Sequence, residues 1–232
     1  MQIYRPQIVE FESNENMRQT VSTFFVDKFL DINGDKGNVR MALDYGENIL
    51  NLCRDISHVT GLDFEKLSLF QIQEILGSDT SYKQEILDSF GPDFADFIGE
   101  KCFFDINLPV EMALKNYREE LENLDGILFD LTILDIKSDD TLAGLFPNQS
   151  YLSHQEDMVI KTVTDANYNE KYRYSMTVET ILNSEEILLL VSGEENREFV
   201  SKFLSPEISV RSNPAKFLLA HPKVTVFQVL EN

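Results

Sequence analysis

Charged and hydroxyl side chains gather in one short segment that directly follows an apolar run at residues 127–134. The segment holds Asp135, Lys137, Asp139, Asp140 and Thr141. A loop that leaves the end of a buried strand is the usual ligand-binding position in α/β proteins. Such loops favour glycine, because glycine lets the backbone approach a ligand closely. Here acids replace glycine, and the threonine cannot serve as a general base near neutral pH.

Composition excludes several classes of function. Forty acidic and 20 basic residues give a formal net charge of -20, which repels nucleic acid, anionic lipid and, more weakly, phosphorylated small molecules. The two cysteines, Cys53 and Cys102, show neither metal-ligand spacing nor a disulfide framework. No long apolar run and no secretion signal appear. We therefore predict a cytoplasmic protein with no metal, no cofactor and no membrane or nucleic-acid partner.

The pattern of apolar residues predicts alternating strands and helices. Strand patterns occur at residues 7–11, 39–43, 67–72, 127–134, 158–163, 172–178, 187–191 and 224–229. Helical patterns occur near residues 17–34, 49–56, 109–124 and 195–204. Uninterrupted apolar strands such as residues 187–191 are typical of strands buried on both faces. We predict a doubly wound α/β fold, a largely parallel sheet with helices on both faces, in a single domain over residues 1–232.

In such a sheet, ligands bind where the strands end. The relevant loops follow Leu43, Ile72, Leu134 and Val191. We expect these four strands to be neighbours, with Gly46, Glu74, Asp139 and Gly193 at the edge of one cleft.

Two stretches resemble a known family. The strand at 130–134, Asp139 and the run 143–147 (AGLFP) resemble the strand and loop of 6-phosphogluconolactonases, which are sugar-phosphate lactonases related to glucosamine-6-phosphate deaminases. A second family segment is resembled by Arg173 with Thr177, the helix at 178–182 and the strand that ends at Gly193. A third is resembled by Pro214 with Ala215. The resemblance implies the 6-phosphogluconolactonase-like fold.

The resemblance also assigns positions in the site, and several hold unexpected residues. The family's catalytic histidine falls on Thr141, while Asp139 is retained, so the catalytic residues are unknown. The phosphate loop falls on residues 43–49, which carry Asp44 and Glu47. The family's lysine falls on Asn196. The implied vestigial ligand pocket is formed by Asp44, Gly46, Glu74, Asp139, Arg173 and Gly193.

Simpler interpretations remain for these residues. Arg173 could be a surface ion-pair partner, Asp139 a turn residue and Glu74 a solvated strand end. His58 and His221 belong to no motif. His154, in the loop after Thr141, is the one histidine that could reach the site.

These observations leave three hypotheses. The first is a catalytically impaired relative of 6-phosphogluconolactonase, acting as a binding or regulatory protein linked to carbohydrate metabolism. It would bind sugar phosphates more weakly than about 1 mM, and its physiological partner is unknown. The alternative is an active 6-phosphogluconolactonase that uses a substituted base. The third is an unrelated flavodoxin-like binding domain whose similarity is only architectural.

Overall fold

A computed structural model describes residues 2–136, 141–152, 157–163 and 172–230. Its main feature is a seven-stranded sheet in the order β1-β10-β9-β6-β2-β3-β5, in which every paired strand is parallel. In that order the strands are Gln7–Phe11, Val224–Val229, Ser184–Val191, Phe129–Asp135, Val39–Leu43, Leu67–Gln71 and Glu100–Cys102. The predicted α/β fold with a largely parallel sheet is confirmed.

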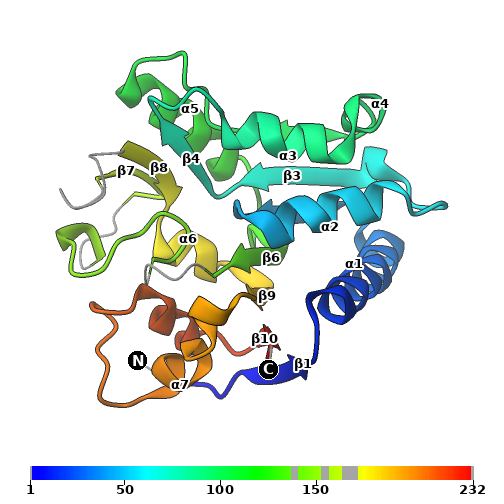
Figure 1. Cartoon of the computed structure of the whole chain (residues 1–232). Helices are drawn as coiled ribbons and strands as arrows, with labels where there is room; N and C mark the ends of the chain where they lie inside the picture. Colours follow the sequence, from blue (N-terminus) through cyan, green and yellow to red (C-terminus); the bar gives the residue numbers. More distant parts are fainter. Residues whose placement is uncertain (1, 137–140, 153–156, 164–171, 231–232) are drawn as a thin grey trace.

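Helices cover both faces of this sheet, and each face has its own apolar core. Alternate residues of β9 show why: Leu188 and Leu190 belong to one core, and Leu189 and Val191 to the other. One core contains buried residues of α1 (Asn14–Lys36), α2 (Glu47–Ser57) and α3 (Tyr82–Phe90). The other core contains buried residues of α5 (Val110–Glu122), α6 (Val178–Leu182) and α7 (Phe199–Leu204). In Figure 1, α1 and α2 lie to the right of β6, β9 and β10, and α6 and α7 to their left.

The first helix shows how local sequence sets its boundaries. The Ser13 side chain accepts a hydrogen bond from the Asn16 N–H (3.2 Å) and caps its start. Gly37, in the left-handed region at φ 73°, ends it and donates to the Asn33 carbonyl (2.9 Å). The predicted end near Gly34 is therefore about one turn too early, because the glycine that terminates the helix is Gly37.

A second sheet, which the sequence did not predict, has three antiparallel strands in the order β4-β8-β7. They are Gln73–Leu76, Tyr172–Met176 and Val159–Val163. The chain enters it directly from β3 at Ile72, whose N–H bonds to Leu43 of the main sheet (2.9 Å) and whose carbonyl accepts from Met176 (2.9 Å). The strand pattern at 67–72 therefore stops at the junction of the two sheets.

Short elements complete the described chain. They are η1 (Phe64–Lys66), α4 (Pro92–Ala95), η2 (Ser150–Leu152), η4 (Glu194–Asn196) and η5 (Pro214–Ala220). The helix predicted near 195–204 is thus split into η4 and α7. Within the described ranges, no helix combines the length and the apolar character that crossing a membrane requires.

Candidate functional site

The strands expected to line a cleft are adjacent in the sheet, in the order β9-β6-β2-β3. Their carboxyl ends bring residues from three loops into contact. The Asn48 amide, at the start of α2, donates to Asp135 Oδ1 (2.6 Å) and to Ser192 Oγ (2.8 Å). Gly193 follows Ser192 with a left-handed φ of 87°. The structure therefore places Gly46, Asp135 and Gly193 around one polar cluster.

The side chain of Asp135, the last residue of β6, lies at the start of α2. Its Oδ2 accepts from the backbone N–H of Asn48 (3.1 Å), and only 7% of the residue is exposed. Any Cβ at position 46 would overlap the Asp135 carboxylate, so Gly46 is required for this close approach. The first N–H groups of a helix and its dipole attract anions. A carboxylate of the chain itself fills that position here.

Asp44 lies beside Asp135 and is 1% exposed. Its Oδ1 accepts from the Tyr45 N–H (2.7 Å) and from Gln73 Nε2 (2.5 Å), and its Oδ2 accepts from the Asp135 N–H (3.3 Å). Gln73 in turn accepts from Arg173 Nη1 (3.2 Å). A continuous chain of hydrogen bonds therefore joins Arg173 to Asp44.

Arg173 lies against the loop that the family resemblance singled out. Its guanidinium is 5.3 Å from the centre of the Phe146 ring, and its side chain borders Gly144. Thr141, in the same loop, is 5% exposed. The Nε of Arg173 is buried, and no group among the described residues forms a hydrogen bond with it. A guanidinium with an unused donor can bind an anion or a carbonyl oxygen, so Arg173 could bind a ligand that carries one of these groups.

Glu74 is neither solvated nor at the edge of the cleft. It is 0% exposed, and its carboxylate caps α3 by accepting from the Tyr82 N–H (2.8 Å), the Lys83 N–H (2.9 Å) and Ser81 Oγ (2.7 Å). Its assignment to the pocket needs correction, because the side chain turns toward α3, a helix that the sequence did not predict.

Other expected site residues have structural contacts or lie outside the described residues. The Asn196 amide donates to the carbonyls of Ile136 (3.1 Å) and Ser192 (2.7 Å), so it holds two loops together. Both ring nitrogens of His221 contact backbone, Nε2 at 2.7 Å from the Ser184 carbonyl. Asp139 and His154 fall outside the described residues.

Sequence reasoning missed a pair of tyrosines beside Asp44. The rings of Tyr45 and Tyr82 stack with centroids 3.6 Å apart, and the Tyr45 hydroxyl donates to Glu85 (2.8 Å). Burial, and then the bond to Glu85, raise the pKa of Tyr45. Tyr45 was visible in the loop after β2, but its partners belong to α3.

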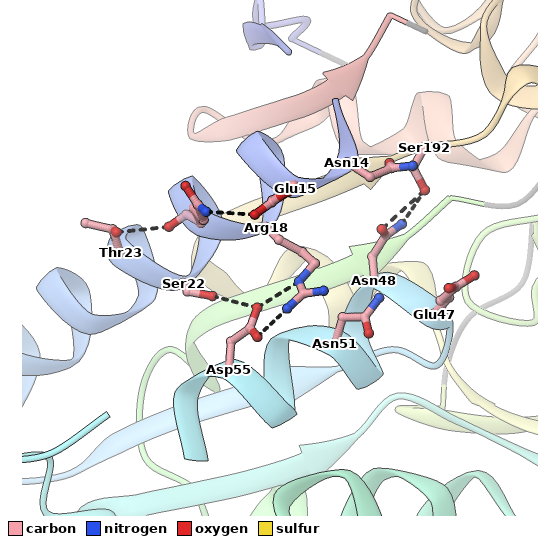
Figure 2. Close-up of a pocket in the computed structure, with 11 residues that line it drawn as sticks. Asn14, Glu15, Arg18, Ser22, Thr23, Glu47, Asn48, Asn51, Asp55 and Ser192 are labelled. Carbon is pink, nitrogen blue, oxygen red and sulfur yellow. Dashed lines mark hydrogen bonds and ion pairs between the residues drawn. The ribbon is translucent and has the colours of Figure 1, made fainter. Parts of the chain in front are cut away.

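A polar groove of about 740 Å³ adjoins the cluster between α1 and α2. Figure 2 shows the Arg18–Asp55 ion pair (2.6 Å) at its centre, with Asn48 and Ser192 at one end. Because the Asn48 side chain also donates to Asp135, this residue connects the groove to the Asp135 carboxylate.

Comparison with known proteins identifies the family. The family model described as glucosamine-6-phosphate isomerases/6-phosphogluconolactonase matches residues 12–227. The chain belongs to this family. The hypothesis of an unrelated flavodoxin-like domain is therefore wrong.

Individual relatives agree with this assignment. A 6-phosphogluconolactonase of Helicobacter pylori is 25% identical over 230 residues, which cover 94% of this chain and 95% of that protein. A 6-phosphogluconolactonase of Borreliella burgdorferi is 26% identical over 114 residues, and that match covers about half of each protein, 49% and 48%. The crystal structure of a 6-phosphogluconolactonase of Shewanella baltica gives a TM-score of 0.85 at 17% identity, covering 98% of this chain and 99% of that one. This structural likeness supports the fold.

Proposed function

We propose that this chain is a non-hydrolytic, carbohydrate-binding member of its family whose cleft does not hold a phosphate at α2. The observation that carries the proposal is the Asp135 carboxylate, bonded to the backbone and side chain of Asn48 at the start of that helix. A phosphate placed there would have to displace a group that already uses the helix N–H.

Charge opposes that displacement. A phosphate at the start of α2 would lie near the buried carboxylates of Asp44 and Asp135. Two like charges about 4 Å apart repel by roughly 1 to 4 kcal/mol at a partly solvated site. Each 1.4 kcal/mol weakens binding about tenfold, so this repulsion supports dissociation constants above about 1 mM for sugar phosphates.

The catalytic position supports the same proposal. Hydrolysis of a lactone requires a base that takes a proton from the attacking water, and a positioned base contributes about 10² to 10⁴ in rate. The buried Thr141 hydroxyl, at the position implied for that base, is not basic near neutral pH.

A second candidate is an active 6-phosphogluconolactonase, and the comparisons favour it. The relative of Helicobacter pylori that matches nearly the whole chain carries that name. In this case Arg173 would bind the phosphate, and the base would come from Asp139 or His154, which lie outside the described residues.

One assay separates the two candidates. Freshly prepared 6-phosphogluconolactone is incubated with the purified chain, and its hydrolysis is compared with the rate in buffer. The non-hydrolytic proposal expects equal rates, and calorimetry with 6-phosphogluconate should give a dissociation constant above about 1 mM. Robust turnover that His154→Ala or Asp139→Asn abolishes would instead establish the active enzyme.

A further inference from the structure

A second cluster of chemically reactive side chains lies at the far edge of the main sheet. Glu100, Cys102 and Glu120 each offer a donor atom, and these atoms all lie within 4.8 Å of one another. Glu100 and Cys102 are two residues apart in β5 and so point to the same side of the strand, while Glu120 comes from α5. All three line a cavity of about 370 Å³ between these elements.

The thiol is what distinguishes this cluster from an ordinary acidic surface. Cys102 is 6% exposed, and among the described residues no group forms a hydrogen bond with its sulfur. Burial, together with Glu100 and Glu120, raises the pKa of the thiol to about 12. The Cys102 side chain packs in the core on the α5 side of the sheet, and its sulfur lies within 4.8 Å of the oxygens of two exposed carboxylates that line the same cavity.

The donor types indicate which ion would fit. Thiolate selects zinc, copper(I) and iron over magnesium and calcium, and Zn²⁺ also accepts carboxylate oxygens. Bond lengths of 2.0 to 2.3 Å in a tetrahedral site place neighbouring donors about 3.5 Å apart. Glu100 and Glu120 are exposed, so their carboxylates can close the remaining distance without moving the core. The net charge of -20 also attracts cations to the surface.

We propose that Glu100, Cys102 and Glu120 bind Zn²⁺ and thereby link β5 to α5, with the fourth position open to the cavity. On binding, the S–H bond of Cys102 breaks, a sulfur–zinc bond forms, and the proton passes to solvent. The cysteine spacing predicted no metal because the third ligand lies on α5, 18 residues beyond Cys102.

The test uses Cd²⁺ and Zn²⁺ salts with the chelator-treated full chain. Cd²⁺ should produce an ultraviolet thiolate-to-metal charge-transfer band that saturates at one ion per chain, and Zn²⁺ should displace it. Cys102→Ser should abolish the band. Cys53→Ala is the matched control, because Cys53 is 0% exposed in the other core and lies away from the cluster, so the band should persist.

The carboxylates are tested separately, by replacing only exposed side chains. Glu100→Gln with Glu120→Gln should weaken Cd²⁺ binding at least tenfold without altering the folded chain, which thermal unfolding checks. The proposal is overturned if the unmodified chain shows no band up to about 1 mM Cd²⁺. It is equally overturned if Cys102→Ser retains the band or if the double carboxylate variant binds as tightly as the unmodified chain. Should Cys102→Ser fail to fold, the double variant still decides the question.

Discussion

Two helices begin near the same edge of the sheets, and each receives a buried carboxylate from its own chain. At α3, Glu74 precedes the helix by only eight residues and accepts five described hydrogen bonds, three of them from Ser81, Tyr82 and Lys83. At α2, Asp135 reaches Asn48 from a strand 87 residues away in sequence. The Glu74 carboxylate caps a helix close to it in sequence, and the Asp135 carboxylate joins two segments that are far apart in sequence.

The two helix starts differ in whether they lie where a ligand could bind. The carboxylate at α3 lies inside the protein and serves folding. The carboxylate at α2 lies where three loops of the main sheet meet, beside the groove of Figure 2. A helix start at this edge of an α/β sheet is a usual anion site. We therefore expect changes at Glu74 to alter stability, and changes at Asp135 to alter binding.

The largest expected effect is that of Glu74→Ala. The change leaves the first N–H groups of α3 and the Gln71 amide without their acceptor in a buried position, which should lower the free energy of unfolding by about 3 kcal/mol. Urea denaturation measures it. Glu122→Ala, at an exposed position in α5, is the control and should change stability by less than about 0.5 kcal/mol. A loss below about 1 kcal/mol at Glu74 would contradict its role as a cap.

The sequence could predict six of the seven strands of the main sheet because those strands carry their own signal, and it missed the short edge strand β5. Strand β9 ends in the continuous apolar run at residues 187–191, which is typical of a strand buried on both faces. Strand β6 carries Leu131, Ile133 and Leu134 between polar residues, and it too is buried throughout. In the second sheet, the sequence predicted strands at the positions of β7 and β8, but it predicted neither β4 nor the pairing of the three strands into a separate sheet. Strand β4 begins with Gln73 and Glu74, and β8 with Tyr172 and Arg173, so their pairing depends on contacts that periodicity does not encode.

For the candidate site, the sequence could predict which residues lie together but not where their side chains point. Strand order and the family resemblance brought Asp44, Gly46 and Gly193 to one place, and the sequence showed that an acid replaces glycine at position 135. The direction of a side chain is a tertiary property. The turn of Asp135 toward Asn48, and of Glu74 toward α3, followed from packing that no local pattern contained.

The next effect is steric and tests the close approach at α2. Gly46 has an extended φ of 168°, so alanine fits the backbone, but its Cβ would overlap the Asp135 carboxylate. Gly46→Ala should therefore cost about 2 kcal/mol of stability. Adding Asp135→Gly should recover most of that loss, and a double-mutant cycle by urea denaturation measures the coupling. Purely additive effects would show that the two residues do not compete for one space.

Asp135→Gly alone tests whether the carboxylate occupies an anion site. The change frees the Asn48 N–H and removes a buried negative charge, so 6-phosphogluconate should bind at least tenfold tighter, about 1.4 kcal/mol, in calorimetry. Glu122→Gln removes the same charge at a distance and should leave the affinity unchanged. If Asp135→Gly and the unmodified chain bind 6-phosphogluconate with equal affinity, the Asp135 carboxylate does not exclude phosphate from the start of α2.

The smallest effect concerns Tyr45, which joins the two regions because it follows Asp44 and contacts α3 through Tyr82 and Glu85. Tyr45→Phe keeps the stacked ring and removes one partly buried hydrogen bond, so stability at pH 7 should fall by about 1 kcal/mol. The pKa of Tyr45 is raised on folding, so the unfolded chain loses this proton first as pH increases. The stabilising contribution is therefore complete below about pH 10, the ordinary tyrosine value, and declines above it. Denaturation curves of both proteins from pH 7 to about pH 11 should converge at the alkaline end. A constant difference across that range would mean that folding, through burial and the bond to Glu85, does not raise the pKa of Tyr45.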